Sequence, residues 1–213
     1  MDAFKDKLIE NLIKDGFLKN PLVINAFQKI DRSNFVIEYL KNDAYANAPL
    51  GIGFGQTISQ PLTVAFMLEL LDAQPGQKVL DVGSGSGWTT ALLAEIVGEK
   101  GKVYGIEIIP ELYEFGKANV MRFSYLKKGI VEMFCGNGIY GLKEKSPFDR
   151  ILCSAEAKEI PSAFKEQLKI GGKIVLPMKN SLWLITKRGE DKFETEEYPG
   201  FVFVPLIEKI SNL

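Results

Sequence analysis

Short apolar runs alternate with helical segments along most of this 213-residue chain, and no other feature limits its fold so strongly. Five runs have the length and apolar character of buried strands, namely residues 78–82, 103–107, 131–135, 150–154 and 173–177. Segments with the apolar spacing of helices lie before the first run or between runs, at 64–71, 89–97, 110–122 and 162–168. Such strand–helix units predict parallel strands joined by right-handed crossovers, and therefore a doubly wound α/β sheet.

The two ends of the chain depart from this alternation. Apolar spacing predicts helices over 4–15 and 21–30. Residues 35–61 are rich in loop formers but contain apolar anchors, so we expect a long ordered loop, a kind that is often functional. Near the other end, 182–187 and 201–207 are predicted to be two antiparallel strands joined by a charged turn.

These elements predict one domain over residues 1–213, which is an ordinary length for a single domain. It would contain a mostly parallel seven-stranded sheet that ends in a C-terminal antiparallel hairpin. Residues 1–60 would supply the N-terminal helices and the long loop, and residues 61–213 the α/β core.

The balance of charge excludes some classes of partner. The 26 basic and 27 acidic side chains give a net charge of −1, so we expect no large cationic field for nucleic acid or an anionic membrane. No apolar run reaches the ~18 residues that span a bilayer, and residues 1–7 are charged, so a cytoplasmic protein is predicted. Cys135 and Cys153 lie in apolar, strand-like runs and are interpreted as reduced core thiols.

A glycine-rich loop follows the first parallel strand and precedes a helix. Its residues are Gly83, Ser84, Gly85, Ser86 and Gly87. Glycines permit a tight turn and a close approach of the backbone to a ligand, and the start of a helix favours negative charge. Glu107 ends the next strand, where a carboxylate can accept hydrogen bonds from both hydroxyls of a ribose. Together these features predict a nucleoside-binding site.

Two further polar residues lie at the same edge of the predicted sheet. Asp81, near the end of the first parallel strand, is expected either to order the glycine loop and its ligand or to bind loop amides alone. Asn137, in Gly136-Asn137-Gly138 after the third strand, can accept a hydrogen bond from an adenine amino group or serve as a turn residue. The carboxyl ends of these strands border one crevice, so both residues are candidates for the same site.

The spacing G-x-G-x-G resembles the loop of class I S-adenosylmethionine-dependent methyltransferases rather than the dinucleotide-binding fingerprint. Residues 49–61, with the tract Gly55-Gln56-Thr57-Ile58-Ser59-Gln60-Pro61, are similar to the signature of the protein-L-isoaspartate (D-aspartate) O-methyltransferase family. Further similar segments are 79–87, 136–138, 147–149, 160–161, 168–172 and 203–206, so that the resemblance covers residues 32–207.

This resemblance implies a Rossmann-like methyltransferase fold and S-adenosylmethionine as cofactor. The implied reaction is methyl transfer to the α-carboxylate of L-isoaspartyl residues in damaged proteins and peptides, after which the ester collapses to a succinimide and repair begins. The chain contains no histidine, which agrees with this reaction. A carboxylate with a pKa near ~4 is already ionised at neutral pH, so neither a general base nor a metal is expected.

Carried over to this sequence, the resemblance implies that Ser59 is the active-site serine and orients the substrate carboxylate by hydrogen bonding. The residues expected at the substrate site are Thr57, Ile58, Ser59, Val204, Pro205 and Leu206. Those expected to bind the cofactor are Asp81, Gly83, Ser84, Gly85, Ser86, Gly87, Glu107, Ile108, Gly136, Asn137 and Gly138. The chain departs from the family pattern at Asn47 and Asn137, where aspartate is usual, and at Gly51, where proline is usual.

Two other functions stay open from the sequence alone. One is a related carboxyl methyltransferase with a specific peptide substrate. The other is a non-catalytic module that binds isoaspartyl peptides or S-adenosylmethionine, although the presence of Ser59, Gly83, Gly85 and Glu107 argues against it.

Overall fold

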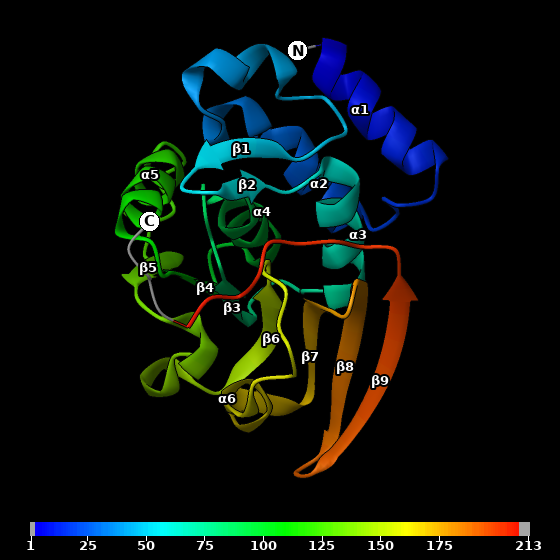
Figure 1. Ribbon diagram of the computed structural model, residues 1–213, viewed down its shortest axis with the longest axis vertical. Coiled ribbons are helices and arrows are strands. Elements are labelled where there is room, and N and C mark those ends of the chain that lie inside the picture. The colour runs from blue at the N-terminus through cyan, green and yellow to red at the C-terminus, as the bar shows by residue number, and fades with distance from the viewer. Residues whose placement is uncertain (1–2, 209–213) are drawn as a thin grey trace.

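The computed structural model describes residues 3–208, and within this range seven strands form one sheet (Figure 1). Their order is β5-β4-β3-β6-β7-β8-β9, with the first five parallel and the last two antiparallel, as predicted. The strands are β3 (Lys78–Val82), β4 (Lys102–Glu107), β5 (Val131–Cys135), β6 (Phe148–Cys153), β7 (Leu168–Met178), β8 (Ser181–Gly189) and β9 (Lys192–Pro199).

Alternate residues of the strands pack on opposite faces of the sheet. In β3, Val79 belongs to the core on one face, and Leu80 and Val82 belong to the core on the other. The first core is built with α1 (Ala3–Lys14), α2 (Pro21–Lys29), α3 (Pro61–Leu71), α4 (Trp88–Val97) and α5 (Pro110–Met121). The second core is completed by α6 (Ser162–Gln167), which buries Phe164. The doubly wound prediction is therefore confirmed, with unequal layers.

The predicted long loop contains regular structure. Two short 3-10 helices, η1 (Arg32–Phe35) and η2 (Glu38–Asp43), lead into a hairpin of β1 (Leu50–Gly53) and β2 (Gln56–Ile58). Phe54 and Gly55 form its turn with positive φ angles of 53° and 68°. Figure 1 shows this hairpin in cyan, above α4 and close to the carboxyl ends of the parallel strands. The loop thus borders the edge of the sheet at which doubly wound folds bind ligands.

The predicted position of the last strand is wrong. The strand that pairs with β8 is Lys192–Pro199, whereas 201–207 form no ladder strand. An edge strand pairs on one side only, and most side chains of β9 are exposed, so its sequence is charged rather than apolar. Gly200, at a φ of 96°, follows the end of this strand. Residues 201–208, which we call the strap, then cross the molecule in the red segment of Figure 1.

The two cysteines are free, as predicted, but only one belongs to the core. Cys153 is buried at the end of β6, while Cys135 is exposed because it ends β5, the outermost strand on that side of the sheet. Between residues 3 and 208, no helix has both the length and the apolar character needed to cross a membrane.

Candidate active site

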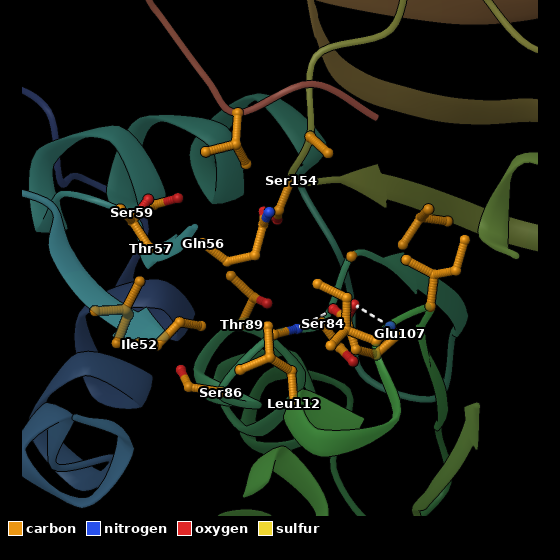
Figure 2. Close-up of a pocket in the computed structure, with 18 of the residues that line it drawn as sticks. Ile52, Gln56, Thr57, Ser59, Ser84, Ser86, Thr89, Glu107, Leu112 and Ser154 are labelled. Atoms are coloured by element: carbon orange, nitrogen blue, oxygen red, sulfur yellow. Dashed lines mark hydrogen bonds between the residues drawn. The ribbon is translucent and has the colours of Figure 1, made fainter. Parts of the chain in front are cut away.

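A cleft opens at the carboxyl ends of β3, β4 and β6, the edge at which doubly wound sheets bind ligands. Backbone groups, hydroxyls and apolar side chains all line it, which is the usual composition of a small-molecule site. The glycine loop, the β1–β2 hairpin and the strap form its walls (Figure 2). We call it the main cleft. A second hollow, the side recess, shares with it Thr57, Ser59, Ser154 and Val204.

The glycine loop joins β3 to α4 and depends on glycine for its shape. Gly83, Gly85 and Gly87 all have positive φ angles, of 74°, 50° and 85°, which L side chains rarely adopt. The loop also lies directly against α5. A Cβ atom at Gly116 would lie 2.4 Å from the carbonyl oxygen of Gly85, and Asn119 Nδ2 donates a hydrogen bond of 3.0 Å to the carbonyl of Ser86. Helix α5 therefore holds the loop in place.

Glu107 ends β4 and is buried beside the loop, with 5% of its surface exposed. Its Oε2 accepts a hydrogen bond of 2.8 Å from the backbone N–H of Gly85, and its Oε1 accepts one of 3.0 Å from the backbone N–H of Ile109. Each carboxylate oxygen has a further lone pair. Because Glu107 and Ile108 both line the main cleft, the carboxylate is in position to accept the two hydroxyls of a ribose.

Asp81 is fully buried behind the loop, and it is not one of the described residues that line the main cleft. Its Oδ2 accepts hydrogen bonds from the hydroxyls of Thr89 and Thr90, at 2.8 and 2.6 Å. Burial raises the pKa of this carboxyl to about 6, against the opposing effect of the two threonine hydrogen bonds. Asp81 therefore orders the first turn of α4, whose Thr89 lines the cleft, rather than binding loop amides.

Ser59 follows β2 and faces both hollows, with Thr57 and Ile58 beside it. Its backbone is held by Arg32, the first residue of η1. The Arg32 guanidinium donates hydrogen bonds to the carbonyls of Ala44, Ala48 and Ser59, at 2.6, 3.2 and 3.1 Å. It also lies 5.1 Å from the ring centroid of Trp88, which lines the main cleft. One buried cation thus connects the candidate substrate loop to the cleft.

The strap is attached to the sheet at Glu156. The backbone N–H of Glu156 donates to the carbonyl of Val204, and the N–H of Leu206 donates to the carbonyl of Glu156, both at 2.8 Å. Val204, Pro205 and Leu206 consequently line the main cleft, and Val204 also lines the side recess. The family resemblance implied that these three residues bind substrate. They line the cleft as a strap and not as a strand, and their contact with substrate stays a prediction.

The segment after β5 contributes less than predicted. Gly138 lines the main cleft and packs so closely on β3 that a Cβ atom there would lie 2.5 Å from Val82 Cγ1. Among the described residues that line the cleft, neither Gly136 nor Asn137 is present. Asn137 Oδ1 accepts from the N–H of Ile139 at 2.9 Å, and Nδ2 donates to the carbonyl of Glu208 at 2.8 Å. Its amide therefore serves the turn and the strap, and the expected adenine contact is not supported by this geometry.

Sequence reasoning missed several residues of the cleft wall. Trp88 and Thr89 begin α4, and Ser154 follows β6 at the same edge as the glycine loop. The position of Ser154 after a central parallel strand was a usable signal. Arg32 carried no comparable signal, because its partners lie 12 to 27 residues away along the chain.

Residues that line the cleft carry polar groups without a hydrogen-bond partner, and these groups fit S-adenosylmethionine as a ligand. The hydroxyl of Ser84 and the indole N–H of Trp88 are buried without a hydrogen-bond partner, and both residues line the main cleft. Buried polar groups in folded proteins almost always have partners, so Ser84 and Trp88 are candidates to bind a ligand in this cleft. Glu107 adds acceptors for a ribose, and apolar side chains of Ile108 and Leu112 can flank a base.

The parallel sheet, the glycine loop and the acid that ends β4 define a class I S-adenosylmethionine-dependent methyltransferase. The family model of protein-L-isoaspartate(D-aspartate) O-methyltransferase matches residues 3–211. The chain therefore belongs to the protein-L-isoaspartate (D-aspartate) O-methyltransferase family.

Individual relatives agree with this assignment. A protein-L-isoaspartate O-methyltransferase of Methanopyrus kandleri is 42% identical over 207 residues, which cover 95% of this chain and 91% of that protein. One from Pyrococcus horikoshii is 44% identical over 206 residues, covering 94% and 91%. A Plasmodium falciparum chain of the same description, crystallised with S-adenosyl-L-homocysteine, has a TM-score of 0.86 at 27% identity and covers 98% of this chain and 100% of its own. The protein is an enzyme, and its cofactor is S-adenosylmethionine.

Proposed function

We propose that this protein methylates the α-carboxylate of L-isoaspartyl residues in damaged proteins and peptides, with Ser59 as the residue that orients this carboxylate. The observation that carries the proposal is the junction of the two hollows. Thr57, Ser59 and Val204 line both the cleft that suits the cofactor and the recess that opens beside it. A peptide bound in the side recess would thus present a carboxylate to the main cleft at Ser59.

The cofactor would be held by the glycine loop, by Glu107 and by Ile108, with Gly138 forming part of the wall. When bound, S-adenosylmethionine supplies a methyl group on a sulfonium sulfur, and its transfer to a carboxylate oxygen requires no proton transfer. The residues of the chain therefore need only to bind, align and exclude water. A site that lacks histidine and relies on hydroxyls and backbone groups meets this requirement.

We further infer that residues 1–60 and 61–213 act as one methyltransferase domain, in which the first part supplies the substrate loop and the second the cofactor core. The contact of Ile52 with the glycine loop supports this inference, since a Cβ atom at Gly85 would lie 3.4 Å from Ile52 Cδ1. The near-zero net charge favours isoaspartyl proteins as partners over nucleic acid or membranes, and the ionised nucleophile makes a metal unnecessary. The cytoplasmic location stays a prediction.

Transfer of a radiolabelled methyl group from S-adenosylmethionine tests this function directly. The substrates are a peptide with one L-isoaspartyl residue and its twin with normal aspartate. We expect label in the isoaspartyl peptide and little in the twin. Equal labelling of the two would identify a less selective carboxyl methyltransferase, and labelling of neither would refute the proposal.

A further inference from the structure

The hydroxyl of Ser154 is buried without a partner at the point where the two hollows meet. Its Oγ is one of five buried side-chain nitrogen and oxygen atoms without a hydrogen bond in the described residues, the others belonging to Arg32, Asp81, Ser84 and Trp88. Ser84 and Trp88 line the main cleft only, while Arg32 and Asp81 line neither hollow. Ser154 alone among them lines both. The only one of these residues that lines both hollows thus carries an unsatisfied donor.

The backbone around Ser154 is fixed from two sides. Its N–H donates a hydrogen bond of 2.9 Å to the carbonyl of Val82, which extends the β3–β6 pairing up to the glycine loop. Two residues later, Glu156 holds the strap through its hydrogen bond with Val204. Figure 2 shows Ser154 at the upper edge of the cleft, with Thr57 and Ser59 on one side and Ser84 and Glu107 on the other. The hydroxyl therefore belongs to a rigid part of the sheet, and Ser59 to a loop.

We infer that Ser154 is a second substrate-contacting residue, whose hydroxyl donates a hydrogen bond to the carboxylate of the isoaspartyl substrate from the sheet side. This inference rests on the proposed function. A carboxylate has two oxygens with several acceptor sites, so it can bind Ser59 and Ser154 together. Donors on two separate elements fix the plane of the carboxylate better than one donor on a loop, and such alignment is the main task of this site.

The position of Ser154 distinguishes this role from cofactor binding. A hydroxyl that served the cofactor alone would be expected on the main cleft alone, as Ser84 is. Hydrogen bonds to charged groups are stronger than those between neutral groups, so a donor between the two hollows binds most strongly to a carboxylate that reaches in from the side recess.

The test compares Ser154→Ala with Ser84→Ala, a matched removal of a second buried and unpartnered hydroxyl. For Ser154→Ala we expect kcat/KM for the isoaspartyl peptide to fall by roughly tenfold to a hundredfold, and the affinity of this peptide for enzyme loaded with S-adenosylhomocysteine to fall in parallel. The calorimetric Kd for S-adenosylhomocysteine should stay unchanged. For Ser84→Ala we expect the opposite, a weaker Kd for S-adenosylhomocysteine.

The melting temperature of the free protein supplies an independent readout. Removing a buried hydroxyl that has no partner should leave the melting temperature of Ser154→Ala equal to that of the wild type or higher. An unchanged kcat/KM, a loss confined to the S-adenosylhomocysteine Kd, or a clear fall in melting temperature would each overturn the role of Ser154. Failure of the wild-type enzyme to methylate the isoaspartyl peptide would instead refute the proposed function.

Discussion

Arg32 donates a hydrogen bond of 3.1 Å to the backbone carbonyl of Ser59, across 27 residues of chain. The same guanidinium binds the carbonyls of Ala44 and Ala48, and only 2% of its surface is exposed. Burial lowers the pKa of Arg32 to about 10, so the side chain still carries its charge at neutral pH. The loop that presents Ser59 is therefore closed around a single buried cation.

Replacing Arg32 should consequently affect stability and catalysis together. In Arg32→Met the three carbonyls lose a charged donor, so we expect the free energy of unfolding to fall by about 2–4 kcal/mol. Urea unfolding measures this loss, and the labelling assay should show a parallel fall in kcat/KM because Ser59 is no longer held. Arg122→Met, at an exposed position, is the control. Equal free energies of unfolding for Arg32→Met and Arg122→Met would show that Arg32 does not hold this loop in place.

Ser59→Ala should impair transfer while sparing the cofactor. Loss of one hydrogen bond to a carboxylate corresponds to a fall in kcat/KM of roughly tenfold to a hundredfold. The calorimetric Kd for S-adenosylhomocysteine should be nearly that of the wild type. Ser162→Ala removes an exposed hydroxyl from the start of α6 and should behave as the wild type in both assays. A matching loss of cofactor affinity in Ser59→Ala would show that the serine serves the cofactor.

Glu107→Gln tests the ribose assignment. An amide keeps one acceptor oxygen, but its NH₂ group cannot accept the N–H of Gly85 or a ribose hydroxyl. We expect the Kd for S-adenosylhomocysteine to rise by roughly tenfold or more. Isothermal calorimetry on the wild type and the variant gives the answer, and equal affinities would rule out the assignment.

Asp81→Asn should alter the dependence of stability on pH. The folded protein raises the pKa of Asp81 from 3.8 to about 6, so it binds this proton more tightly than the unfolded chain does. The stability contributed by the protonated form is complete below pH ~4 and is lost as the pH rises through ~6. An asparagine has no such loss.

The difference in unfolding free energy between Asp81→Asn and the wild type should therefore move in favour of the variant from pH 4 to pH 7, by roughly 2–3 kcal/mol. Other titrating groups are common to both proteins and cancel in the difference. Urea unfolding at several pH values measures it. Parallel profiles would mean that folding leaves the pKa of Asp81 unchanged.

Gly116→Ala should disrupt the glycine loop from a distance. Alanine is normally favoured over glycine inside a helix, but here its Cβ would lie 2.4 Å from the carbonyl oxygen of Gly85. We expect a loss of several kcal/mol in unfolding free energy, together with weaker cofactor binding. Gly136→Ala, where a Cβ meets nothing within 4 Å, is the matched control and should lose neither. Full tolerance of alanine at 116 would contradict the close packing.

The fold could be predicted wherever burial imposed a pattern on the sequence. The apolar strands of the sheet, such as 78–82 and 103–107, were recognisable because both faces are covered. The edge strand β9 was not, because its exposed side chains are charged and the apolar strap after it looked more like a strand. The hairpin over 50–58 was not predicted because both strands are very short and β1 contains two glycines among its four residues.

The site, too, contains residues that could be predicted from the sequence and residues that could not. Gly83, Gly85 and Glu107 were identified because backbone conformation and strand position fix what they do. Asn137 has its amide engaged by Ile139 and Glu208, and Arg32 acts through carbonyls far along the chain. Both depend on tertiary contacts that a local pattern does not contain.

The packing of Gly116 against the glycine loop also limits how this enzyme can be redesigned. Strand β3, the loop and α4 look like a portable module, but the loop is shaped in part by Gly116 and by the amide of Asn119, both from α5. A graft that ended at α4 would remove the α5 residues that contact the carbonyls of Gly85 and Ser86. The smallest piece that could carry this loop into another sheet therefore runs from residue 78 to residue 121.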